Sequence, residues 1–249
     1  MNLAHPYAVG NTADIYRFNN RIIKVFKEGF SENEAVHEAE KQVCAYKCGL
    51  DVPEVIEVTE INGRQSIIME YIEGTTIGER LLGNMEQADY YIDNCVQVQQ
   101  TIHLTDIQET SIEWMTEKLT RQIISTDQLS DYIKDLLLYR LNSMKFVPRL
   151  CHGDFHPFNI IVNKNKMTII DWVDSSIGDI RADVYRTYLM FSQSSTILAQ
   201  KYLHSYCLQS GLSQEEVFQW APIVAGARLS EQIPLENKKH LRKIIDFFI

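Results

Sequence analysis

Three polar side chains in the centre of the chain have the types and spacing needed for chemistry on a phosphate. Asp154 lies in Cys-His-Gly-Asp-Phe-His-Pro-Phe-Asn, residues 151–159, which ends at Asn159, and Asp171 follows twelve positions later. Phosphoryl transfer needs an aspartate that orients the acceptor hydroxyl and accepts its proton, and it needs oxygen ligands that hold Mg²⁺ on the nucleotide phosphates. The pattern predicts Asp154 as the catalytic residue and Asn159 and Asp171 as the magnesium ligands.

The histidines of this segment allow another interpretation. His152, Asp154 and His156 could form a transition-metal cluster, but such sites usually combine two or three imidazoles in open geometry. A cluster would also leave Asn159 and Asp171 without a role. We therefore expect His152 to brace the loop and His156 to pack or hydrogen-bond locally. The structural alternative for Asp154 is an ordinary Asx turn.

A lysine lies inside an apolar segment near the N-terminus. Lys24 is the middle residue of Ile-Ile-Lys-Val-Phe, residues 22–26. A lysine among apolar neighbours needs a counter-charge, and it could hold the α and β phosphates of a nucleotide. Glu38 and Glu40, on the helix expected next, both compete for this pairing. The alternative is an edge-strand lysine that reaches solvent.

The first seventy or so residues predict a small antiparallel sheet with one helix. Two pairs of short strands are each joined by a two-residue hairpin turn, Asn19-Asn20 and Asn62-Gly63. A capping box at Ser31-Glu32-Asn33-Glu34 begins a helix between the two pairs. The expected strands are residues 14–18, 21–26, 54–59 and 65–71. The residues that recur at helical spacing, and so predict the buried face of the helix, are Val36, Ala39, Val43, Tyr46 and Leu50.

Two further segments of this region are candidates for nucleotide contact. The turn at residues 10–16 begins with Gly10 and could cover phosphates, although a single glycine is also compatible with an ordinary hairpin. The strand at residues 69–74 could bond the adenine edge through its backbone around Glu70 and Ile72. A plain interdomain strand is equally compatible with that segment.

A break at Glu73-Gly74-Thr75 marks the expected boundary between a lobe of residues 1–73 and a lobe of residues 74–249. The second lobe is predicted to be mainly helical, and a hairpin of residues 160–162 and 167–170 places Asp171 at a strand end. The fold class is therefore α+β, with a small antiparallel-sheet lobe and a larger helical lobe. The expected helices are residues 75–82, 86–104, 111–125, 127–145, 180–192, 195–210, 213–224 and 234–247.

Composition narrows the classes of partner. The net charge of −9 and the pI near 5.3 argue against nucleic acid, and they could favour a cationic substrate or serve solubility alone. Of the five cysteines, Cys44 and Cys48 are four positions apart, and no second pair has the spacing of zinc ligands. This indicates reduced thiols in a cytoplasmic protein. No apolar run reaches transmembrane length, and the first ten residues lack the pattern of a signal peptide. We therefore expect no membrane partner; the oligomeric state stays open.

Several other charged residues have candidate roles. We expect His103 to be structural and Asp183 to cap or tether the helix that follows it. Arg181 and Arg186 are candidates for phosphate contacts, with surface ion pairs as the preferred alternative. Glu231 and Glu236 could contact an amine-rich substrate, with solvated helix acids as the preferred alternative.

The chain resembles the aminoglycoside phosphotransferase superfamily, which also includes choline, homoserine, fructosamine and methylthioribose kinases and spore-coat proteins. The motif His-Gly-Asp-x-His-Pro-x-Asn is specific to this superfamily, whereas protein kinases usually show His-Arg-Asp. The matching segments occur in order between residue 10 and about residue 185; they are Gly10–Tyr16, Ile22–Phe26, Glu38 with Gly49 and Pro53, Met69–Gly74, His103, His152–Asn159 and Ile169–Trp172.

The resemblance implies a bilobal protein-kinase-like fold and phosphorylation of a small-molecule hydroxyl with ATP (GTP is possible) and Mg²⁺. It implies Asp154 as the catalytic aspartate, Asn159 and Asp171 as the metal ligands and Lys24 as the phosphate anchor. The spacing to Gly49 and Pro53 favours Glu38 as the partner of Lys24.

An aminoglycoside antibiotic is the favoured acceptor, which would make the activity one of antibiotic resistance. The alternative is a metabolite kinase of the choline, homoserine or sugar type. A non-catalytic nucleotide-binding or scaffold protein is a rival, although every expected catalytic position is filled. A kinase acting on proteins is disfavoured, because the long activation segment and the Ala-Pro-Glu signature are missing.

Overall fold

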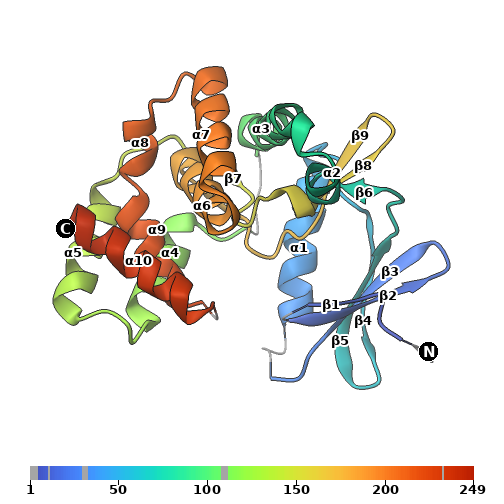
Figure 1. The fold of residues 1–249 in the computed structure, drawn as a ribbon. Helices are drawn as coiled ribbons and strands as arrows, with labels where there is room; N and C mark the ends of the chain where they lie inside the picture. The colour runs from blue at the N-terminus through green and yellow to red at the C-terminus, as the bar shows by residue number, and fades with distance from the viewer. Residues whose placement is uncertain (1–4, 11, 30–32, 108–111, 232) are drawn as a thin grey trace. The chain divides into compact units, whose positions relative to one another are not determined.

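The computed structural model describes residues 5–10, 12–29, 33–107, 112–231 and 233–249 (Figure 1). They form two compact units. The sheet unit contains the described parts of residues 1–80, 109–112 and 157–174, and the helical unit contains those of residues 81–108, 113–156 and 175–249. These units are defined by packing, and they place residues 157–174 with the sheet. They therefore do not test the predicted lobe boundary after residue 73, which stays a prediction.

A five-stranded antiparallel sheet forms the main body of the sheet unit, with strand order β1-β2-β3-β5-β4. Its strands are β1 (Ala8–Val9), β2 (Ala13–Phe18), β3 (Arg21–Phe26), β4 (Val55–Ile61) and β5 (Arg64–Glu70). The two predicted hairpin turns are present. Asn19, Asn62 and Gly63 adopt positive φ angles of 52°, 53° and 74°, the left-handed conformation that tight hairpins require.

Helix α1 (Glu34–Lys47) packs on β4 and β5, but its buried face differs from the predicted one. Val36 and Tyr46 are exposed, and the buried residues are Ala35, Glu38, Ala39, Gln42 and Ala45. Ala39 and Leu50 of the predicted set are buried, so the prediction was right in part. Two of the buried residues are polar and have buried partners, which apolar spacing alone could not indicate. The predicted capping box at Ser31 lies outside the described residues; Asn33 precedes the helix and its side chain makes no capping hydrogen bond.

The hairpin that follows residues 151–159 belongs to a second, three-stranded sheet in the sheet unit. Its order is β6-β8-β9, with β6 (Thr75–Thr76), β8 (Ile160–Asn163) and β9 (Lys166–Ile169). A short 3-10 helix (Pro157–Asn159) precedes β8. The Ile169 amide donates to the Asp51 carbonyl at 2.8 Å, and this bond ties the hairpin to the segment that follows α1.

The helical unit is built around buried aromatic side chains of α6 and α7, with Trp220 just before α9. Two short strands, β7 (Arg149–Cys151) and β10 (Ser176–Gly178), pair antiparallel inside it. Helix α2 (Ile77–Gly83) spans the division between the units. The remaining elements are a 3-10 turn (Met85–Gln87), α3 (Ala88–Leu104), α4 (Met115–Ser125), α5 (Asp131–Ser143), α6 (Ile180–Ser194), α7 (Thr196–Ser210), α8 (Gln214–Phe218), α9 (Ala221–Arg228) and α10 (Leu235–Phe248).

The predicted helix of residues 213–224 is in fact two helices, α8 and α9. Ser213 and Glu216 form a capping box that begins α8. Pro222 lies in the first turn of α9, where its missing N–H costs no helical hydrogen bond, whereas inside a continuous helix it would break one. None of the described helices combines the length and the apolar character that a membrane crossing requires.

Candidate active site

A cavity of about 290 Å³ lies within the sheet unit, with mainly apolar walls and charged side chains among its lining. Its lining residues come from β1, β2, β3, α1, the end of β5 and the β8–β9 hairpin: Tyr7, Ala8, Ile15, Ile22, Lys24, Glu38, Gln42, Pro53, Met69, Glu70, Tyr71, Ile72, Ile161, Ile170 and Asp171. An apolar slot that also contains an ammonium and carboxylates suits a ligand with a flat ring and a charged tail.

Lys24 is the centre of the charged group in this cavity. Its Nζ donates to Glu38 Oε1 at 2.6 Å and to Asp171 Oδ1 at 3.3 Å. Lys24 and Glu38 are buried, whereas the Asp171 side chain is 39% exposed. Glu40 is exposed on the other side of α1, so the glutamate paired with Lys24 is Glu38.

The charges of this group favour a protonated lysine. Burial by itself would lower the pKa of Lys24, but the nearby Asp171 and Glu38 carboxylates outweigh it and hold that pKa above its ordinary value. Burial raises the pKa of Glu38, and the nearby Asp171 carboxylate raises it further, although the charge of Lys24 acts in the opposite direction. The arrangement keeps one fixed positive charge at the cavity wall, which is the requirement for holding nucleotide phosphates.

Asn159 and Asp171 lie at the same end of the β8–β9 hairpin. Ile160 faces Ile169 in the strand register, and the Ile170 amide donates to the Asn159 carbonyl at 3.0 Å. Asp171 has a φ of 64°, an unusual conformation for a residue other than glycine, and such backbone strain is concentrated at functional sites. An amide oxygen and a carboxylate on adjacent strand ends are hard ligands that fit Mg²⁺.

The other predicted nucleotide contacts lie at different places around the cavity. Glu70 and Ile72 are among its lining residues, at the end of β5 and just beyond. Gly10 is not; it forms the turn between β1 and β2, where its amide donates to the Ala13 carbonyl and its carbonyl accepts from Lys27. Its role as a phosphate cover stays a prediction.

Replacement of Lys24 by methionine should weaken MgATP binding at least tenfold, because it removes the ammonium found among the described lining residues and leaves Glu38 buried without its cation. Binding would be measured by calorimetry with a non-hydrolysable ATP analogue. Lys47→Met, on the exposed end of α1, is the matched control and should bind normally. Unchanged affinity in Lys24→Met would contradict this role.

The loop that carries Asp154 lies in the helical unit, directly after β7. His152 is fully buried, and its Nδ1 accepts from the Asp154 amide at 3.3 Å. His156 Nε2 is 3.6 Å from the Asp154 carboxylate. The structure therefore gives His152 a bracing role in the loop, and the Asp154 carboxylate is 27% exposed and accessible to a substrate.

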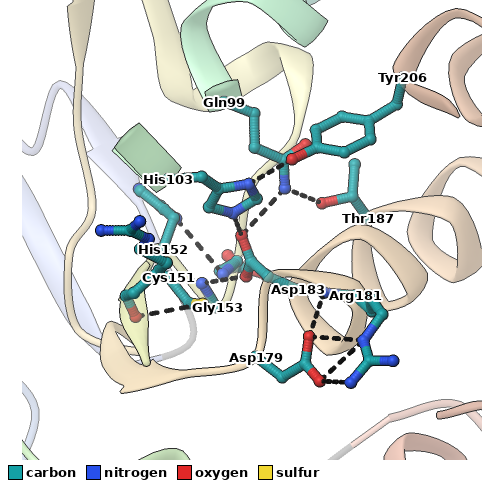
Figure 2. A network of polar contacts seen from close by, with 12 residues as sticks. Gln99, His103, Cys151, His152, Gly153, Asp179, Arg181, Asp183, Thr187 and Tyr206 are labelled. Carbon is teal, nitrogen blue, oxygen red and sulfur yellow. Dashed lines mark hydrogen bonds and ion pairs between the residues drawn. The ribbon is translucent and has the colours of Figure 1, made fainter. Parts of the chain in front are cut away.

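A buried polar network holds this loop in place (Figure 2). Asp183 on α6 accepts from the Gly153 amide at 2.8 Å through one carboxylate oxygen. Its other oxygen accepts from Gln99 at 2.9 Å and lies 3.0 Å from His103 Nε2. The Tyr206 hydroxyl lies 2.5 Å from the second ring nitrogen of His103. Helix α3 thus contacts the Asp183 carboxylate of α6 directly, α7 is joined to it through His103, and the carboxylate fixes the backbone next to Asp154.

This network revises the expected roles of two residues. Asp183 does not cap α6; the cap is Asp179, whose side chain accepts from the Arg181 amide at 2.8 Å. Asp183 instead reaches back thirty positions in sequence to Gly153, a function that no local pattern could reveal. His103 is structural, as expected. Arg181 forms an ion pair with Asp179, the role that we preferred over a phosphate contact.

Glu231, considered above as a contact for an amine-rich substrate, is already bonded to Arg186 and Arg228. The side chain of Glu236, the other candidate, lies outside the described ones.

The stability of the protein should fall in acid because of Asp183. Burial alone would raise the pKa of Asp183. The hydrogen bond to His103 and the charge of His103, together with the Gln99 and Gly153 donors, outweigh burial and lower that pKa from 3.8 to about 2. A carboxyl with a depressed pKa stabilises the fold above its unfolded pKa and loses that contribution as the pH falls through the folded pKa. We expect a loss of about 2 kcal/mol between pH 4 and pH 2.

This acid dependence would be measured by urea unfolding at a series of pH values. The variant Asp183→Asn should show a shallower decline over the same range, since its side chain does not titrate. An identical decline in the wild type and in Asp183→Asn would assign the acid sensitivity to other carboxyl groups.

Comparison with known proteins places the chain in a family. The profile of the phosphotransferase enzyme family matches residues 4–220, most of the chain. The chain belongs to this family, and it is an enzyme of the phosphotransferase class that acts on hydroxyl groups. A search of curated protein sequences found no match.

Solved structures share the fold at low sequence identity. A thermostable mutant of aminoglycoside phosphotransferase APH(4)-Ia, in ternary complex with AMP-PNP and hygromycin B, aligns with a TM-score of 0.70 and 12% identity over 98% of this chain and 91% of that one. An aminoglycoside-3'-phosphotransferase of type VIII aligns with a TM-score of 0.64 and 18% identity over 92% of this chain and 91% of that one. A choline/ethanolamine kinase family protein from Mesorhizobium loti aligns with a TM-score of 0.62 and 16% identity over 99% of this chain and 85% of that one. The fold is protein-kinase-like, as the resemblance implied.

Proposed function

We propose that this protein transfers the γ-phosphoryl group of ATP to a hydroxyl of a small molecule. The observation that carries the proposal is the charged group of Lys24, Glu38 and Asp171 inside a largely apolar cavity. The solved structure with AMP-PNP and hygromycin B supports it, because that protein of the same fold binds a nucleotide and a hydroxylated small molecule together.

In this proposal each residue has one task. The apolar lining receives the adenine ring, and the backbone that follows β5, near Glu70 and Ile72, offers hydrogen bonds to its edge. Lys24 holds the phosphates, while Glu38 fixes the position of the ammonium. Asn159 and Asp171 would hold Mg²⁺, which neutralises phosphate charge when bound. GTP in place of ATP is a further possibility that nucleotide competition would decide.

Asp154 would orient the acceptor hydroxyl and accept its proton as the phosphoryl group leaves ATP. The buried anchor at Gly153 supports this role, because a catalytic carboxylate must be held within a fraction of an ångström of its productive position. The Asp154 side chain is partly exposed, so a substrate hydroxyl can approach it.

The proposal leaves two classes of acceptor. Aminoglycosides are favoured by the resemblance, and metabolites of the choline, homoserine or sugar type are the alternative; the similar solved structures include proteins of both kinds. A decisive test is MgATP consumption by the purified protein against a panel of these acceptors, with Asp154→Ala as the control. Turnover that depends on an acceptor and disappears in the control supports a kinase. Mg²⁺-dependent ATP binding without turnover on any acceptor would favour a non-catalytic nucleotide-binding protein.

A further inference from the structure

Gln42 is a buried amide side chain in the wall of the cavity that Lys24 lines. It lies on α1, one turn beyond Glu38, and is only 2% exposed. The walls of the cavity are mainly apolar, and ligand pockets of this kind use a few well-placed polar groups to orient the ligand. A buried amide is also costly unless its polar atoms find partners. The partners of Gln42 therefore bear on what the cavity binds.

The neighbours of Gln42 fix the orientation of its amide. Nε2 donates to the Pro53 carbonyl at 2.8 Å and lies 3.7 Å from Met69 Sδ. Both neighbours can only accept, because a carbonyl oxygen and a thioether sulfur carry no hydrogen. The reversed amide would set Oε1 against the Pro53 carbonyl. The hydrogen-bond network thus decides which atom of the amide is nitrogen and which is oxygen.

The oxygen of the same amide is available to a ligand. Oε1 accepts no hydrogen bond from the residues that the structure describes, and it is not one of the unpartnered side-chain atoms that are sealed from solvent. Gln42, Pro53 and Met69 all line the cavity, so the open oxygen belongs to its wall. An acceptor held in one orientation and without a partner suits a ligand that donates a hydrogen bond there.

Gln42 lies where the base of the nucleotide is proposed to bind. Met69, which Gln42 Nε2 approaches, pairs with Ile22 in the sheet. Ile22 is two strand positions, about 7 Å, from Lys24, which holds the phosphates in the proposed function. The backbone near Glu70, assigned above to the adenine edge, follows Met69 directly.

We propose that Gln42 Oε1 accepts a hydrogen bond from the 6-amino group of adenine and thereby makes the protein select ATP over GTP. This inference rests on the proposed function. The amino group has two hydrogens, and the backbone after β5 can accept one of them, so the second needs another acceptor. Guanine has an oxygen at position 6. That oxygen would face the Gln42 oxygen, leave it without a donor and be repelled by it.

A purely structural role for Gln42 makes a different prediction. The bond from Nε2 to the Pro53 carbonyl joins α1 to the segment before β4 whether or not a nucleotide is bound. Loss of that bond alone would change the affinity for every nucleotide by the same factor. Base selection by Oε1 instead changes the ratio of affinities between nucleotides, so the ratio is the quantity to measure.

The first experiment compares MgADP with MgGDP by calorimetry, because diphosphates bind without turnover. We expect the wild type to prefer MgADP at least tenfold and Gln42→Leu to lose at least fivefold of that preference. Leucine is similar in size to glutamine and removes both polar groups of the amide. Gln97→Leu, at an exposed position of α3, is the matched control and should keep the wild-type preference.

The second experiment isolates the amino group itself. Purine riboside diphosphate has a hydrogen at position 6 in place of the amino group and is otherwise the same as ADP. We expect the wild type to prefer MgADP over this analogue at least fivefold. Gln42→Leu should retain only the part of the preference that comes from the backbone, at least threefold less than in the wild type. The two ligands and two proteins form a cycle that measures the coupling of Gln42 to the amino group.

Each failure has a distinct meaning. Tight binding of MgADP with the same affinity ratios in the wild type and in Gln42→Leu overturns the role of Gln42 and leaves the proposed function intact. Absence of binding by every nucleotide refutes the nucleotide site and the proposed function with it.

The inference can be tested even if Gln42→Leu does not fold, which thermal unfolding would show. Equal affinity of the wild type for MgADP and MgGDP overturns the inference without any variant. Gln42→Asn would then replace the leucine variant, since asparagine keeps the amide but withdraws its oxygen by one methylene group. A wild-type preference in Gln42→Asn would also overturn the inference.

Discussion

Asp154→Ala is expected to lower turnover by about 10²- to 10⁴-fold, the contribution of a positioned general base, and to leave nucleotide affinity unchanged. The reason is the location of the residue. Asp154 is in the loop held by Asp183 and is absent from the lining of the Lys24 cavity, whose described residues all belong to the sheet unit. The measurements are the rate of acceptor-dependent ATP consumption and the calorimetric affinity for an ATP analogue.

The matched control for this variant is Asp246→Ala, which removes an exposed carboxylate from α10 of the same unit. It should retain wild-type turnover. Wild-type turnover in Asp154→Ala would remove the basis for phosphotransfer through this loop. A loss of nucleotide affinity parallel to the loss of rate would instead show that Asp154 acts on nucleotide binding.

Asp183→Ala is expected to lower the free energy of unfolding by about 3–5 kcal/mol, the usual cost of breaking a buried charged pair. Three donors, from Gly153, Gln99 and His103, would lose their common acceptor in a site that excludes water. The loop that carries Asp154 would also lose its anchor, so turnover should fall even at temperatures where the variant is folded. Urea unfolding gives the stability, and kinetics well below the midpoint give the rate.

Two comparisons separate anchoring from general instability. Asp183→Asn keeps one acceptor oxygen for the Gly153 amide and should lose less stability and less activity than Asp183→Ala. Asp246→Ala, at an exposed position, should change stability by no more than about 0.5 kcal/mol. A change of similar size in Asp183→Ala would show that the network contributes little to the fold.

Local pattern was sufficient for most of the fold. The turns at Asn19-Asn20 and Asn62-Gly63 were predictable because tight hairpins need residues that tolerate positive φ. The ends of most long helices were predictable because apolar spacing, capping residues and prolines act over only a few positions of the sequence. The face of α1 was not, because Glu38 and Gln42 turn inward toward Lys24 and the Pro53 carbonyl, partners outside the helix.

The sequence by itself determined the chemistry of the candidate site. Asp154, Asn159 and Asp171 share one motif of fixed spacing, and a short hairpin brings the last two to neighbouring strand ends. Lys24 could be recognised because a lysine in an apolar strand requires a counter-charge. Only the tertiary structure decided that Glu38 supplies it, that Asp183 anchors Gly153, and that Arg186 and Arg228 meet at Glu231. Three of these contacts join residues 14, 30 and 45 positions apart, and only the contact of Arg228 with Glu231 is local, at a spacing of three. The three long-range contacts depend on how elements pack and leave no periodic trace in the sequence.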